Sequence, residues 1–119
     1  MRTGRTAVGV AQVAYNEQAW QSLVSNPQNR LDAIRPVIEK LGGRVVNAYF
    51  AFGDYDFVLI TELPDNVSAA ALAIAASAGG ACKSVKTTPL MENAEGLEAL
   101  RKAATSGYRA PTSGRSTTA

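Results

Sequence analysis

Alternation of apolar and polar positions predicts strands at both ends of the folded region. Residues 6–15, TAVGVAQVAY, are small or β-branched at alternate positions, with Val8 and Val10 on one face and Val13 and Tyr15 on the other. We expect a further strand over residues 81–90, ACKSVKTTPL, where Pro89 and the two lysines are typical of a strand at a sheet edge.

Two more apolar segments lie close together in the middle of the chain. Residues 44–52 are rich in Val, Tyr and Phe, and residues 57–63 are almost continuously apolar. Gly53 and Asp54 between them predict a hairpin turn, because glycine adopts a positive φ at little cost.

Helical periodicity predicts helices in the segments between these strands. We expect a short helix over 18–24, a longer one that begins at Asn26 and Pro27, and an alanine-rich one over 67–78. Asn before Pro suits a helix start, since the proline lacks an N–H that would be unpaired there. The apolar stripe of the second helix consists of Leu31, Ile34, Ile38 and Leu41, and it ends at Gly42 and Gly43.

The predicted order is βαββαβ with a further helix over 93–104, an α+β arrangement in one domain of residues 1–104. Residues 105–119 have mostly small, polar side chains and contain Pro and Gly, which predicts a tail that is flexible unless a partner holds it. The third strand carries apolar side chains on both faces, with Phe57 and Leu59 on one and Val58 and Ile60 on the other. If helices cover only one side of the sheet, the apolar side chains on its second face are exposed to water. We therefore expect the second face to pack against another copy of the chain.

Composition excludes several classes of function. The 119 residues carry 12 basic and 10 acidic side chains, and Arg109 and Arg115 of the tail account for the whole excess of +2. The neutral body argues against a nucleic-acid-binding surface. The absence of histidine and the single Cys82 argue against zinc sites, serine triads and cofactors held by histidine. No segment is long enough to span a bilayer or typical of a signal peptide, which predicts a cytoplasmic protein.

A set of short motifs, in this order, resembles the GYD-domain family over roughly residues 6–104. They are Ala19-Trp20, Asn26-Pro27 with Arg30, Leu41-Gly42-Gly43, Gly53-Asp54-Tyr55-Asp56, Pro64-Asp65-Asn66 and Lys86-Thr87-Thr88-Pro89-Leu90. The resemblance implies a ferredoxin-like fold of the dimeric α/β-barrel kind, in which two sheets pack face to face. It implies little about activity, because related barrels include cofactor-free monooxygenases, small cyclases and ligand-sensing domains.

Two residues near the predicted hairpin are candidates for catalysis. Asp56 begins the row that continues with Val58 and Ile60, and burial there would favour a protonated acid able to exchange a proton. The alternative is that its carboxylate accepts hydrogen bonds from turn amides. Tyr55 is a candidate phenol donor, although aromatic packing at an interface is the favoured explanation.

Five further residues are candidates for ligand binding. Trp20 lies on a short helix that could close one end of a cavity, and the lysines lie on opposite faces of the fourth strand, where one could bind an anion. The full set is Tyr15, Trp20, Tyr49, Lys83 and Lys86. Cys82 is interpreted as a quiet, buried thiol because no histidine can activate it.

Three functions remain open from the sequence. The first is a non-catalytic homo-oligomer that binds a small organic or anionic ligand, or a protein partner, without metal, cofactor, nucleic acid or membrane. The second is a cofactor-independent enzyme that uses Asp56 and a tyrosine on a hydrophobic substrate. The third is a structural protein whose small-residue helix and tail join copies into larger assemblies.

Overall fold

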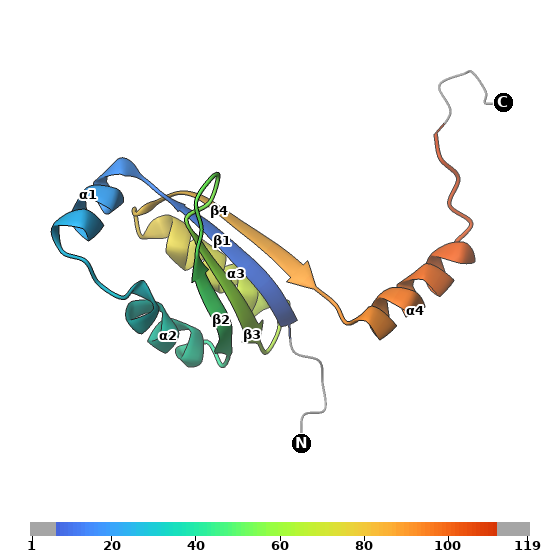
Figure 1. The fold of residues 1–119 in the computed structure, drawn as a ribbon. Helices are drawn as coiled ribbons and strands as arrows, with labels where there is room; N and C mark the ends of the chain where they lie inside the picture. The colour runs from blue at the N-terminus through green and yellow to red at the C-terminus, as the bar shows by residue number, and fades with distance from the viewer. Residues whose placement is uncertain (1–6, 112–119) are drawn as a thin grey trace.

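The computed structural model describes residues 7–111 and contains one four-stranded antiparallel sheet and four helices (Figure 1). The strands are β1 (Ala7–Tyr15), β2 (Arg44–Phe50), β3 (Phe57–Leu63) and β4 (Cys82–Leu90), in the spatial order β2-β3-β1-β4. The helices are α1 (Glu17–Ser25), α2 (Arg30–Lys40), α3 (Asn66–Ala78) and α4 (Asn93–Ala104). This order and pairing confirm the predicted α+β, ferredoxin-like fold, with β4 at a sheet edge.

The two faces of the sheet differ because side chains alternate along each strand. On β3, Phe57, Leu59 and Leu63 are buried on the face that carries α2 and α3, whereas Val58 and Ile60 are half-buried on the other face. The β1–β3 register places Val10 opposite Ile60. We call this second side the open face; the aliphatic side chains at its centre are Val8, Val10, Val58 and Ile60. In Figure 1 α3 lies behind the strands, and the open face is turned toward the reader.

The core lies between the sheet and helices α2 and α3. Ile38 of α2 is 0% exposed and packs in one cluster with Leu59 and Leu63 of β3 and Leu72 of α3. Burial of an aliphatic side chain of this size stabilises the fold by about 2 kcal/mol. The predicted stripe on α2 therefore anchors that helix to the sheet.

The junction of α2 and β2 brings backbone very close to β3. Gly42 has φ +92°, a conformation that suits glycine, and the Gly43 N–H donates to the Ile38 carbonyl at 3.0 Å. A Cβ placed on Gly43 would overlap the Glu62 carbonyl oxygen and lie 2.6 Å from Leu63 Cδ2. The predicted glycine pair thus ends the helix and lets the chain pass against the neighbouring strand.

The predicted start of the second helix is wrong. Helix α2 begins at Arg30, and the Asn29 side chain caps it by accepting the Leu31 N–H at 3.0 Å. Asn26 instead ends α1, since its N–H donates to the Ser22 carbonyl at 2.9 Å. Two asparagines three residues apart both suit a cap, and the local sequence does not decide which helix each one serves.

The connection between β2 and β3 is wider than the predicted two-residue turn. Strand β2 ends at Phe50, and residues 51–56 form a loop closed by the Ala51 N–H, which donates to the Asp56 carbonyl at 2.9 Å. Gly53 has φ +138°, as a glycine at the tip permits. The Asp56 N–H donates to the Val13 carbonyl at 2.8 Å, so the end of the loop is held on β1.

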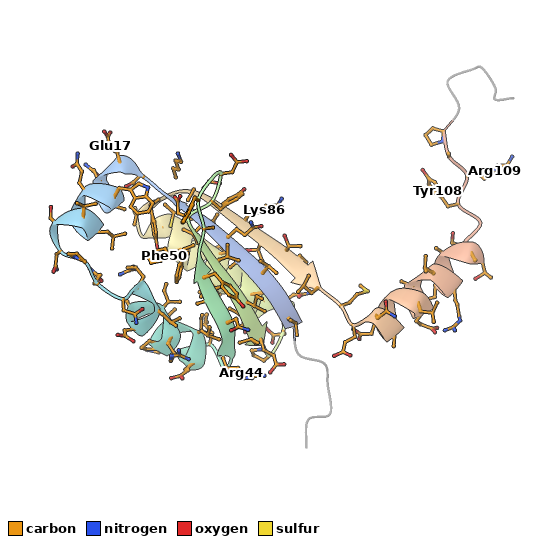
Figure 2. All side chains as sticks on the ribbon, in the orientation of Figure 1. Glu17, Arg44, Phe50, Lys86, Tyr108 and Arg109 are labelled. Atoms are coloured by element: carbon orange, nitrogen blue, oxygen red, sulfur yellow. The ribbon has the colours of Figure 1, made fainter. Side chains whose placement is uncertain are left out.

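Helix α4 follows β4 after two residues and projects away from the sheet (Figure 1). Its bounds match the predicted ones, and its leucines, Leu97 and Leu100, are exposed. Figure 2 shows Tyr108 and Arg109 beyond α4 and distant from the sheet. Residues 105–111 of the predicted tail are exposed, and residues 112–119 lie outside the described part of the chain.

Candidate functional site

A cavity of about 630 Å³ lies between the sheet and helices α2 and α3; we call it the helix-side cavity. The Ala11 and Leu59 strand positions line its floor, and Ile34 of α2 lines one wall. Helix α3 lines the other wall with Ala69, Ala73 and neighbouring alanines. Short side chains on α3 cannot fill the space above the sheet, so the alanine-rich sequence itself accounts for the cavity.

The titratable groups of the helix-side cavity gather at one end, and the neutral polar side chains of Thr61, Asn66 and Thr87 also line it. Tyr15 from the end of β1, Arg30 from the first turn of α2 and Cys82 from the start of β4 all line it at that end. Arg30 is half-buried, and its Nη1 donates to Gln28 Oε1 at 3.2 Å. Within residues 7–111 no carboxylate forms an ion pair with Arg30, and no other charged side chain lines the cavity.

Burial changes the acidity of two of these groups. It raises the pKa of the Tyr15 phenol, and the Arg30 guanidinium beside it offsets part of that rise. Burial likewise raises the pKa of the Cys82 thiol, again with a smaller opposing effect of Arg30. Near neutral pH both groups are therefore protonated, and each can donate a hydrogen bond into the cavity.

Cys82 should react slowly with iodoacetamide at pH 7.5, because the thiolate is the nucleophile and a raised pKa lowers its fraction. The rate should climb with pH through a midpoint above that of an unperturbed cysteine, about 8.5. Mass spectrometry of the alkylated protein over pH 7–10 measures this profile. A midpoint at or below that of free cysteine would show that the thiol is not desolvated.

Trp20 and Lys83 lie beside this end rather than in the cavity. The Trp20 ring packs edge-to-face on Tyr15, with centroids 5.4 Å apart and an interplanar angle of 83°. A shallow hollow beside Tyr15 is lined by Trp20, Lys83 and Glu17. Figure 2 labels Glu17 on α1. Lys83 is the extra residue of a β-bulge, so the alternation that placed Lys83 and Lys86 on opposite faces is interrupted between them.

Asp56 has a structural partner. Its Oδ2 accepts the backbone N–H of Tyr15 at 2.9 Å, so the carboxylate holds the end of β1 rather than an amide of its own turn. Asp56 and Tyr55 are both half-buried, and neither lines the helix-side cavity. Their assignment as catalytic groups stays a prediction.

Tyr49 and Lys86 lie on the open face, on the two edge strands. Tyr49 pairs with Val58 across β2 and β3 and is 53% exposed, and Lys86 pairs with Gln12 across β4 and β1 (Figure 2). The structure therefore places the predicted ligand-binding residues in three locations. Of the five, Tyr15 alone lines the helix-side cavity.

The sequence reasoning missed Arg30 and the cavity role of Cys82. Arg30 precedes Ile34 by one helical turn, so it shares a face with the apolar stripe of α2. An arginine at the start of such a stripe is a detectable signal for a cation beside an apolar surface. The sequence around Cys82 contains no comparable signal for a position at the cavity.

Among residues 7–111, no three metal-ligating side chains gather in one place. In the same residues, none of the helices has the length and apolar character needed to cross a membrane.

The fold and the comparisons together define the class of this protein. It is a ferredoxin-like α+β domain, and it is similar in fold to the crystal structure of MtbAldR, with a TM-score of 0.56 and 17% identity. The match covers 78% of this chain and 61% of the MtbAldR chain, so this chain spans less than two thirds of that protein's length. The GYD-domain model matches residues 10–100, and the chain therefore belongs to the GYD-domain family, as predicted. No curated protein matches the sequence.

Proposed function

We propose that this chain is a homodimeric, non-catalytic module that binds a small apolar molecule in the helix-side cavity. The observation that carries the proposal is the cavity itself. Its volume of about 630 Å³ is typical of small-molecule sites, and its lining is mostly apolar, with Tyr15, Arg30 and Cys82 together at one end. An apolar ligand there would complete the packing that the alanines of α3 leave unfinished.

The homodimer rests on the open face. Val8, Val10, Val58 and Ile60 form an aliphatic surface that no helix among residues 7–111 covers. Two such faces would pack about 10 Å apart and remove this surface from water. Because the helix-side cavity opens on the opposite side of the sheet, such a dimer would leave both cavities accessible.

The other two hypotheses have less support. No contact among the described residues favours an enzyme over a binding module, since the Asp56 carboxylate is engaged by a backbone amide. The exposed leucines of α4 are compatible with further assembly, but nothing identifies the surface that they would contact. The binding module therefore remains the conclusion.

A cavity-filling variant tests the proposal with 1-octanol as a neutral apolar probe. Ala73 lines the helix-side cavity, so the Ala73→Phe variant should place a ring inside it and weaken 1-octanol binding at least about 10-fold. Isothermal titration calorimetry measures the affinity, and circular dichroism checks that the variant folds. Ala78→Phe, an exposed position on α3 outside the cavity, is the matched control and should bind like the wild type. Failure of the wild type to bind either 1-octanol or its carboxylate analogue octanoate, or equal 1-octanol binding to Ala73→Phe, would overturn the proposal.

A further inference from the structure

The geometry points to an apolar carboxylic acid as the ligand of the helix-side cavity, bound as its carboxylate with the head group at Arg30 and the apolar part along α3. This inference rests on the proposed function and specifies the chemical class of the ligand. It assigns Arg30 as the anion-binding residue, a role that neither the family nor the fold similarity provides.

The positive charge of Arg30 at the polar end is not balanced by a carboxylate on the described lining of the cavity. Among residues 7–111, Arg30 is the one charged residue that lines the cavity. It is half-buried, and its hydrogen-bond partners, Gln28 and Tyr15, are both neutral. A guanidinium beside an apolar, partly water-excluded space interacts more strongly with an anion than it would in bulk water. A carboxylate fits its planar donors in a bidentate manner.

The neighbouring groups favour an anion of single charge. The Tyr15 phenol and the Cys82 thiol are kept protonated by burial, so both present donors and neither competes with the ligand for Arg30 as an anion. Asp56 also acts on Tyr15 electrostatically, but its Oδ2 is engaged by the Tyr15 N–H and it does not line the cavity. One cation balances a carboxylate, whereas a phosphate would carry further negative charge with no second cation on the lining.

The separation of polar and apolar lining sets the orientation. Tyr15, Arg30 and Cys82 lie together at one end. The wall formed by α3 presents Ala69, Ala73 and other small apolar groups after Asn66 at its start, and Thr61 of β3 adds one neutral hydroxyl. A ligand with a charged head and an apolar body matches this division. A molecule that is polar throughout would leave its polar groups unpaired against α3, at a cost in affinity.

The test compares octanoate with 1-octanol, two probes that share an apolar chain and differ in the charged head. At pH 7.5 the wild-type full-length chain should bind octanoate about 10-fold or more tightly than 1-octanol, because a hydrogen bond to a charged group contributes more than a neutral one. Arg30→Gln should remove this preference by weakening octanoate binding at least about 10-fold. Arg30→Lys should retain part of the preference, and Arg35→Gln, an exposed arginine on the same helix, should retain all of it.

Isothermal titration calorimetry gives the affinities, and octanoate should also slow alkylation of Cys82, which lines the same end of the cavity. If both probes bind equally, if 1-octanol is preferred, or if Arg30→Gln leaves the preference intact, the inference is overturned while the binding module stands. If neither probe binds, the proposed function fails and the inference falls with it.

Discussion

Replacing Gly43 with alanine should destabilise the domain more than any other single methyl addition to a glycine between residues 7 and 111. A Cβ at this position would overlap the Glu62 carbonyl oxygen and lie 3.1 Å from the Leu63 Cα, and neither backbone atom can rotate away. Overpacking against side chains typically costs 1–3 kcal/mol, and backbone has less freedom to adjust, so we expect a loss of about 3 kcal/mol in the free energy of unfolding. Urea denaturation followed by circular dichroism measures the change.

Gly96→Ala is the matched control for this change. Gly96 lies inside α4, where an added Cβ meets nothing within 4 Å, and alanine has a higher helix propensity than glycine. The denaturation midpoint of this variant should therefore equal or exceed that of the wild type. Similar midpoints for Gly43→Ala and Gly96→Ala would show that the α2–β2 junction is not packed against β3 in this way.

The fold was predictable where one periodicity was dominant. The continuous apolar run over 57–63 and the three- and four-residue spacing from Leu31 to Leu41 each fit one element, and the structure contains both, although α2 begins later than predicted. The glycine pair after Leu41 was equally clear, because few other residues permit that turn. Long-range pairing, however, left no local signal. Asp56 binds the backbone of Tyr15, 41 residues away, and no turn pattern in the hairpin predicts that partner.

The candidate site was harder to predict than the fold for a related reason. A cavity arises from volume that side chains fail to fill, and the alanines of α3 reveal this only when the distance from α3 to the sheet is known. The sequence search favoured conspicuous residues such as Tyr49, Lys83 and Lys86, which the fold places outside the cavity. Tyr15 was predictable from its place at the end of a strand. Arg30 was not, because its position at one end of the cavity depends on where α2 begins, and the sequence placed that start at Asn26 and Pro27.

An aspartate at Ile60 should convert the proposed dimer into monomers. Ile60 is half-buried at the centre of the open face, opposite Val10, so a single copy leaves an introduced carboxylate partly hydrated. In a face-to-face dimer the same carboxylate would be buried against the aliphatic surface of the partner without a counter-charge, a cost of several kcal/mol. We expect Ile60→Asp to weaken dimerisation by about 100-fold or more. Light scattering after size exclusion distinguishes 12.5 kDa from twice that mass.

The control and a second measurement separate the dimer from the ligand site. Ile74→Asp adds the same charge at a position on α3 that is 67% exposed, and this variant should remain dimeric. A wild-type chain that is monomeric at micromolar concentration, or an Ile60→Asp chain that is still dimeric, would contradict face-to-face packing. Because the helix-side cavity is formed by one copy alone, monomeric Ile60→Asp should still bind 1-octanol with wild-type affinity. Loss of binding together with loss of the dimer would instead mean that the cavity needs its partner to hold α2 and α3 in place.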